Sequence, residues 1–140
     1  MNRWIVYQQE RFPLAAHAPL VAAFSASAVC YSALVRGATT APPWRSFLAA
    51  FVTSLVFFLQ LRIADEFKDF EEDSRYRPYR PVPRGLVTLR ELATLFVILV
   101  LIQLALALWL SVRLIPLLLI TWTYLALERL AGKAGKQRPR

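Results

Sequence analysis

The stretch LATLFVILVLIQLALALWLSV, residues 92–112, decides the fold, because it runs for 21 residues without an Asp, Glu, Lys or Arg. A helix that crosses a bilayer needs about 20 predominantly apolar residues, so this stretch is expected to be a transmembrane helix. Three further stretches, of 14 to 24 residues, also lack these charged residues. The sequence therefore predicts an all-α fold, a polytopic membrane bundle of about four transmembrane helices. These helices are expected near residues 13–35, 44–73, 89–111 and 114–130.

The composition of the whole chain agrees with a lipid environment. Hydrophobic residues make up 57% of the 140 residues and charged residues only 19%. In soluble domains, hydrophobic residues average roughly 45–50% and charged residues about 25%. The chain has a single Cys and a single His. It therefore cannot form an internal disulfide, and it lacks the residues for a thiolate or imidazole metal site.

Basic residues are distributed unevenly between the two ends of such a bundle. If all four segments cross the membrane, 14 Lys and Arg residues lie on the side that carries the N-terminus, residues 62–91 and the C-terminus. The other side has three, Arg36, Arg45 and Arg113. Because basic residues are retained in the cytoplasm, both termini and the 62–91 segment are expected to be cytoplasmic, in a bacterial-type inner (plasma) membrane. Residues 132–140 are expected to form a basic, disordered tail that is attracted to anionic membrane lipid and not to nucleic acid.

The 62–91 segment, RIADEFKDFEEDSRYRPYRPVPRGLVTLRE, carries the chemistry. Six of the nine acids of the chain fall between Asp65 and Asp73. If the second membrane helix continues through them, five acids share one face of about 120°, since each residue advances by about 100°. These five are Asp65, Glu66, Asp69, Glu72 and Asp73. Like charges repel and the C-terminal end of a helix disfavours anions, so a compensating cation is expected. Oxygen ligands favour a hard ion such as Mg²⁺.

Four arginines follow the acids in a proline-containing loop. They are Arg75, Arg77, Arg80 and Arg84. The guanidinium group matches phosphate oxygens. Acidic residues that could bind a metal, followed by arginines that could bind phosphate, therefore suggest a lipid substrate that carries a diphosphate. The alternative is a solvated loop whose acids and bases pair with little net energy. After the loop, Thr88 and Glu91 have the spacing of a capping box that begins a helix.

These residues resemble the UbiA family of intramembrane aromatic prenyltransferases. The first motif of that family, N-D-x-x-D-x-x-x-D, corresponds to residues 65–73 (DEFKDFEED), and its R-P-[LV]-x-x-G corresponds to residues 80–85 (RPVPRG). The resemblance implies that the catalytic and Mg²⁺-binding residues are Asp65, Glu66, Asp69 and Asp73. Two of them differ from the family pattern, since Asp65 replaces Asn and Glu66 replaces Asp. The resemblance also implies that Arg80 binds the substrate diphosphate or serves as a structural partner, with Lys68, Arg75, Arg77 and Arg84 as less specific candidates for the diphosphate.

The activity that the resemblance implies is Mg²⁺-dependent transfer of a prenyl group from a prenyl diphosphate to an aromatic or related lipophilic acceptor. Residues 1–131 correspond to the N-terminal half of such a bundle, because the second Asp-rich motif of the family is absent and Glu128 stands where the family has a Lys. Three interpretations stay open: a fragment, a truncated product, or a half that pairs with a second copy of itself or with another subunit. The alternative function is a non-catalytic membrane subunit or adaptor that retains the prenyl-diphosphate-binding motif.

Overall fold

The computed structural model describes residues 2–136, apart from the side chains of Arg129 and residues 132–136. The described part consists of helices and their connections, which confirms the predicted all-α bundle. The helices are α1 (Arg3–Arg11), α2 (Leu14–Val35), α3 (Trp44–Tyr76), α4 (Leu89–Leu110), the short 3-10 helix η1 (Val112–Leu114) and α5 (Ile115–Lys136). α5 continues through Lys136, which lies inside the range predicted to be a disordered tail, and the rest of that range, 137–140, lies outside the described residues.

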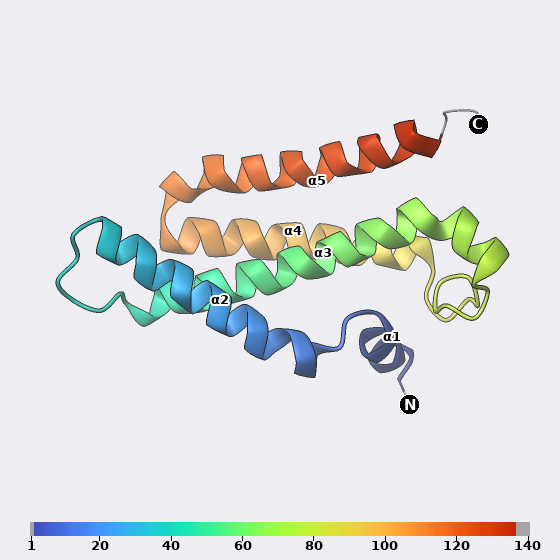
Figure 1. Cartoon of the computed structure of the whole chain (residues 1–140), viewed down its shortest axis with the longest axis horizontal. Helices are drawn as coiled ribbons and strands as arrows, with labels where there is room; N and C mark the ends of the chain where they lie inside the picture. Colours follow the sequence, from blue (N-terminus) through green and yellow to red (C-terminus); the bar gives the residue numbers. More distant parts are fainter. Residues whose placement is uncertain (1, 137–140) are drawn as a thin grey trace.

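Helices α2 to α5 lie along the long axis of the molecule (Figure 1). Among the described residues, three helices are long and apolar enough to cross a membrane, namely α2, α3 and α4. A helix of 22 residues, such as α2 or α4, is about 33 Å long, which matches a hydrocarbon core of about 30 Å. α5 also has 22 residues and packs against α3 and α4. A fourth crossing by α5 stays a prediction.

Local sequence explains where the long helices begin and end. Pro43 directly precedes α3 in an extended backbone conformation, a position where its missing amide hydrogen removes no intrahelical hydrogen bond. The predicted capping box at the start of α4 is confirmed, since the Thr88 hydroxyl accepts from the Glu91 amide and the Glu91 carboxylate accepts from the Thr88 amide. α2 is followed by Gly37 at φ +74°, a left-handed conformation that glycine adopts without steric cost.

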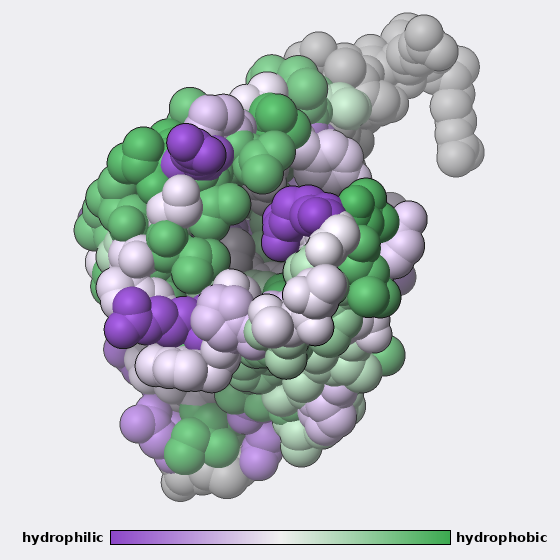
Figure 2. Space-filling model, turned by 90° about the vertical axis from the view of Figure 1, so that its left-hand side faces the viewer, coloured by the Kyte–Doolittle hydropathy of each residue, from purple (hydrophilic) through white to green (hydrophobic). Residues whose placement is uncertain are grey.

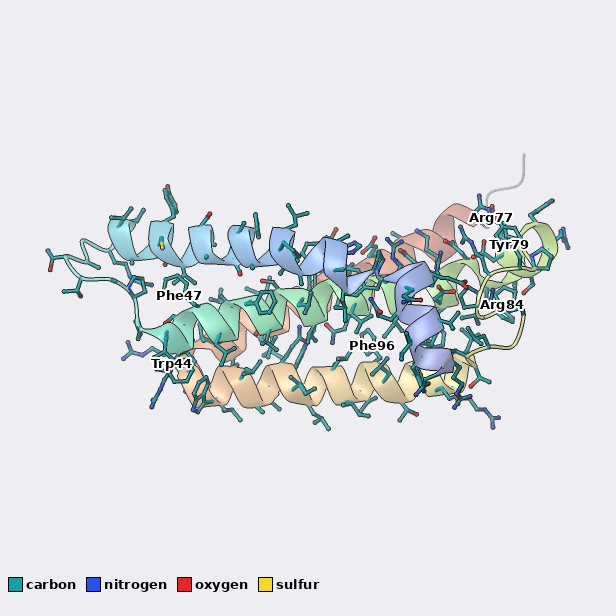
Figure 3. The ribbon with its side chains drawn as sticks, turned by 90° about the horizontal axis from the view of Figure 1, so that it is seen from below. Trp44, Phe47, Arg77, Tyr79, Arg84 and Phe96 are labelled. Carbon is teal, nitrogen blue, oxygen red and sulfur yellow. The ribbon has the colours of Figure 1, made fainter. Side chains whose placement is uncertain are left out.

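The helix α1 has no counterpart in the sequence prediction. It begins with Asn2, whose side chain accepts a hydrogen bond from the amide of Trp4. Tyr7 and the following Phe12 are buried, so this nine-residue helix is held by packing, as short helices generally require. Figure 3 shows α1 crossing the bundle near the end that carries the α3–α4 connection.

The core of the bundle surrounds α3, which packs against α2, α4 and α5. The buried residues that pack together come from α1, α3, α4 and the α3–α4 connection: Tyr7, Val56, Ile63, Val82, Val87, Leu92 and Leu99. Many large apolar side chains on the outer faces of the helices are exposed, among them Leu20, Phe24, Leu101 and Ile120. An outward-facing apolar surface of this extent is expected for helices that contact lipid.

Candidate functional site

The acidic segment forms the C-terminal part of α3, where this helix extends past its apolar half. Two of the four motif acids, Glu66 and Asp73, are each only 2% exposed. Asp65 and Asp69 are half-buried, whereas Glu72 is exposed. Glu66 and Asp73 lie seven residues apart, which is about two helical turns, so both point from the same side of α3. The buried acids therefore face the protein, and Asp65 and Asp69 lie along the more accessible edge of that face.

Glu66 is neutralised by a cation from a distant part of the chain. The guanidinium Nε of Arg11, at the end of α1, donates to the carboxylate Oε1 of Glu66. The two side chains are 14% and 1% exposed. Because a buried carboxylate without a partner is strongly unfavourable, this ion pair explains how Glu66 can be buried. It also holds α1 against the motif.

Asp73 is neutralised by the loop that follows α3. One carboxylate oxygen of Asp73 accepts from Nη1 of Arg80, and the other lies 3.5 Å from Nη1 of Arg77. The loop turns back towards the helix through backbone hydrogen bonds from Arg77 to the Asp73 carbonyl (2.8 Å) and from Arg80 to the Arg77 carbonyl (3.0 Å). Pro81 and Val82 are buried beneath it. Two of the predicted diphosphate-binding arginines therefore lie beside the last acid of the motif.

The other predicted residues surround this centre. Asp65 is 3.6 Å from Arg62, one turn earlier on α3. Arg84 donates to Glu10 of α1 at 2.9 Å and to the Tyr79 carbonyl at 3.1 Å. Lys68 and Arg75 are exposed. Figure 3 shows Arg77, Tyr79 and Arg84 together at one end of the molecule. The structure thus brings the acids of α3 and the arginines of the loop to the same end of the bundle.

Several residues of this region were missed by the sequence analysis, and α1 contributes most of them. Arg11 and Glu10 pair with residues of the motif and loop, and Arg3 pairs with Glu91 at the start of α4 at 2.5 Å. The phenol oxygen of Tyr7 is buried and has no hydrogen-bond partner in the described part of the chain. Burial and the charge of Glu66 raise the pKa of Tyr7 above its usual value of 10.0. No local pattern in residues 3–11 indicates these long-range pairs.

A buried amide lies on α3 before the acids. Gln60 is 0% exposed, and within the described residues neither its amide nitrogen nor its amide oxygen has a hydrogen-bond partner. Buried polar groups are normally satisfied, so Gln60 is an exception within the described residues. It precedes Glu66 by about one and a half turns, which places it on the membrane side of the motif.

The carboxylates fit Mg²⁺ in chemical type. Mg²⁺ commonly uses one or two carboxylates and completes its octahedron with water and phosphate oxygens. Asp65 and Asp69, four residues apart and half-buried, satisfy that requirement. Glu66 is paired with Arg11 and Asp73 with Arg80. Across residues 2–136, no three His, Cys, Asp or Glu side chains whose positions are described lie close enough together to hold a metal ion by themselves. The arrangement therefore suits a metal that shares its coordination with a phosphate-bearing ligand.

One comparison with known proteins identifies a family. The family model of the UbiA prenyltransferase family matches residues 25–127. The match includes the four motif acids and every arginine of the α3–α4 connection, and it leaves α1 outside. No curated protein and no solved structure matches the chain. Because the family model covers most of its length, the chain belongs to the UbiA prenyltransferase family.

Proposed function

We propose that this protein, alone or paired with a second copy or another subunit, catalyses Mg²⁺-dependent transfer of a prenyl group from a prenyl diphosphate to an aromatic or related lipophilic acceptor. Family membership supports prenyl transfer. The observation that carries the proposal is the placement of the α3 acids beside the loop arginines, at the point where α3 leaves the apolar bundle. A charged head group bound there leaves its isoprenoid chain next to the apolar helices.

The residues divide into two roles. Asp65 and Asp69 are the carboxylates that would hold Mg²⁺, which when bound neutralises charge on the diphosphate leaving group. Glu66 and Asp73 position Arg11 and Arg80 instead, because each buried carboxylate fixes one guanidinium group by a direct contact. A positioned guanidinium group can donate to phosphate oxygens without a large loss of side-chain entropy.

Prenyl transfer also requires that water is kept away from the reacting carbon, and the apolar bundle next to the motif supports this. Cleavage of an allylic diphosphate creates a carbocation that water would quench, so water has to be excluded from the carbon that reacts. Ile63 is 0% exposed one turn before the acids of α3, and Leu92 is 0% exposed on the facing helix α4. These side chains separate the polar end of the bundle from its interior.

We also propose that the motif faces the cytoplasm. The N-terminal helix α1, the α3–α4 connection and the end of α5 all lie at one end of the bundle (Figure 1). Of the 15 Lys and Arg residues within residues 2–136, twelve belong to that end. The positive-inside rule therefore supports a cytoplasmic motif in a bacterial-type inner membrane.

The test is turnover by the purified protein in lipid nanodiscs. Prenyl diphosphate, Mg²⁺ and a panel of aromatic acceptors are added, and both inorganic diphosphate and prenylated acceptor are measured. Wild type is expected to form both products, and Asp69→Asn is expected to form neither. Glu71→Gln is the matched control, because Glu71 is exposed on α3 and lies outside the proposed site.

The same experiment separates the alternative function. Mg²⁺-dependent binding of prenyl diphosphate without product, with every acceptor and at high protein concentration, would favour a non-catalytic subunit that retains the binding motif. Absence of both binding and turnover would contradict the proposed function as well as this alternative.

A further inference from the structure

A second site lies at the opposite end of the bundle from the acidic motif. An open cavity of about 570 Å³ is lined by α2, α3, α4, α5 and the 36–43 connection. This volume is within the range of small-molecule pockets. Figure 2 shows this end of the molecule, where a hollow opens among apolar residues and hydrophilic residues border it.

The walls of the cavity are mostly apolar, with several Ser and Thr residues among them, and small residues line it from several helices. Ala33 of α2, Ala49 of α3 and Ala107 of α4 leave space that larger side chains would fill, and Leu118 of α5 closes one side. The amide of Gln103, on the inner wall, is already engaged, since it donates to the Thr53 carbonyl (3.4 Å) and accepts from the Trp122 indole (2.9 Å). The interior therefore suits a hydrocarbon chain.

Arg36 gives the cavity a charged lining residue. It is the C-cap residue of α2, where a helix favours a cation, and its side chain is exposed beside the 36–43 connection. All nine acids of the chain lie on α1, the second half of α3, the start of α4 and the second half of α5, at the other end of the bundle. Among the residues that the structure describes, no carboxylate therefore lies at the end of the bundle that carries Arg36.

The other two arginines of this end differ from Arg36. The guanidinium group of Arg45 lies 6.0 Å from the ring centre of Trp44 and 5.5 Å from that of Trp109, so it is engaged in cation–π contacts. Arg113 belongs to η1 and does not line the cavity. Arg36 alone combines a positive charge with the apolar space.

We propose that this cavity binds one hydrocarbon chain of an anionic phospholipid, with the head-group phosphate paired to Arg36. The lipid comes from the leaflet opposite the catalytic motif. A prenyl chain whose diphosphate is held on the motif would have to extend along the bundle to reach this position. Ser54 is the last α3 residue that lines the cavity, and Asp65 lies 11 residues, or about 16 Å of helix, further on. The inference is independent of the proposed catalytic function.

The experiment measures bound lipid by native mass spectrometry after the detergent-purified protein is equilibrated with phosphatidylglycerol or with phosphatidylcholine. Wild type is expected to retain phosphatidylglycerol preferentially. Arg36→Gln is expected to bind it about fivefold more weakly, the effect of one arginine at an anionic membrane surface, and Arg113→Gln is the matched control that keeps the wild-type affinity. Equal affinity of wild type and Arg36→Gln, or an equal loss in both variants, would overturn the proposal.

Four further arms identify what occupies the cavity. Ala107→Leu, checked for folding by thermal unfolding, should weaken long-chain phosphatidylglycerol binding because it fills apolar space. Short-chain phosphatidylglycerol should bind more weakly than the long-chain form, and excess inorganic phosphate should not displace the lipid. Displacement by inorganic phosphate would reduce the site to an anion site at Arg36. If a prenyl diphosphate displaces the lipid equally well from wild type and from Arg36→Gln, the cavity would be assigned to the substrate chain. Either result contradicts the proposal.

Discussion

The ion pair between Arg11 and Glu66 is expected to hold α1 on the bundle, and Arg11→Met tests it. The Glu66 side chain is 1% exposed and that of Arg11 is 14% exposed, so removal of the guanidinium group leaves a buried carboxylate without a partner. Breaking a buried pair in this way costs about 3–5 kcal/mol. Because the residual exposure of Arg11 admits some water, we expect the lower end, about 3 kcal/mol. Equilibrium unfolding by SDS in mixed micelles, followed by tryptophan fluorescence, measures the change.

Two further variants test whether the loss of stability comes from a buried, unpaired carboxylate. Adding Glu66→Gln to Arg11→Met removes the stranded charge and should recover at least half of the lost stability. Glu10→Gln breaks the pair between Glu10 and Arg84, whose side chains are 40% and 36% exposed, respectively. This change should cost less than about 1 kcal/mol. If Arg11→Met costs no more than Glu10→Gln, or if the double variant recovers nothing, the buried pair does not anchor α1.

Three further predictions concern other parts of the bundle. Tyr7→Phe should raise stability by about 1 kcal/mol, because it removes a buried hydroxyl without a partner. Wild type is expected to lose stability above pH 10. There the unfolded chain releases the Tyr7 proton, whereas the folded chain retains it because its pKa is raised. Tyr7→Phe should abolish this loss. Thr88→Ala should cost about 1 kcal/mol by removing the cap of α4. Gln103→Leu should cost about 1–2 kcal/mol, because it leaves the Trp122 indole without its acceptor. SDS unfolding at several pH values measures all three, and no change in stability would contradict each explanation.

The bundle could be predicted from the sequence because lipid imposes a simple rule on composition. A charge-free stretch such as residues 92–112 has few alternatives to a helix, since every backbone polar group has to be satisfied internally. The predicted capping box of Thr88 and Glu91 was confirmed for a similar reason, because its partners are three residues apart. α1 was missed because its nine residues have no long apolar run and depend on burial of Tyr7 and Phe12.

The residue types of the site were predictable, but their partners were not. Helical periodicity places five of the six acids of residues 65–73 on one side of α3, and the structure buries two of them, Glu66 and Asp73. The neutralising cation of Glu66 comes from Arg11, 55 residues away in the chain. Only the path of the chain between α1 and α3 brings these groups together. The clustered acids were expected to need a compensating cation, and arginines supply part of that charge. The spacing of the acids in the sequence does not show whether the cation is an arginine or a metal ion.

The most direct test of the central claim is equilibrium binding of a radiolabelled prenyl diphosphate during a Mg²⁺ titration, with the full chain in nanodiscs. We expect wild type and Glu71→Gln to bind only when Mg²⁺ is present, and Asp69→Asn to lose this binding. Arg80→Gln should bind at least tenfold more weakly, because a charge-assisted hydrogen bond contributes about 1.5–3 kcal/mol. Binding that needs no Mg²⁺, or that Asp69→Asn leaves unchanged, would contradict the assignment of this end of the bundle as a prenyl-diphosphate site.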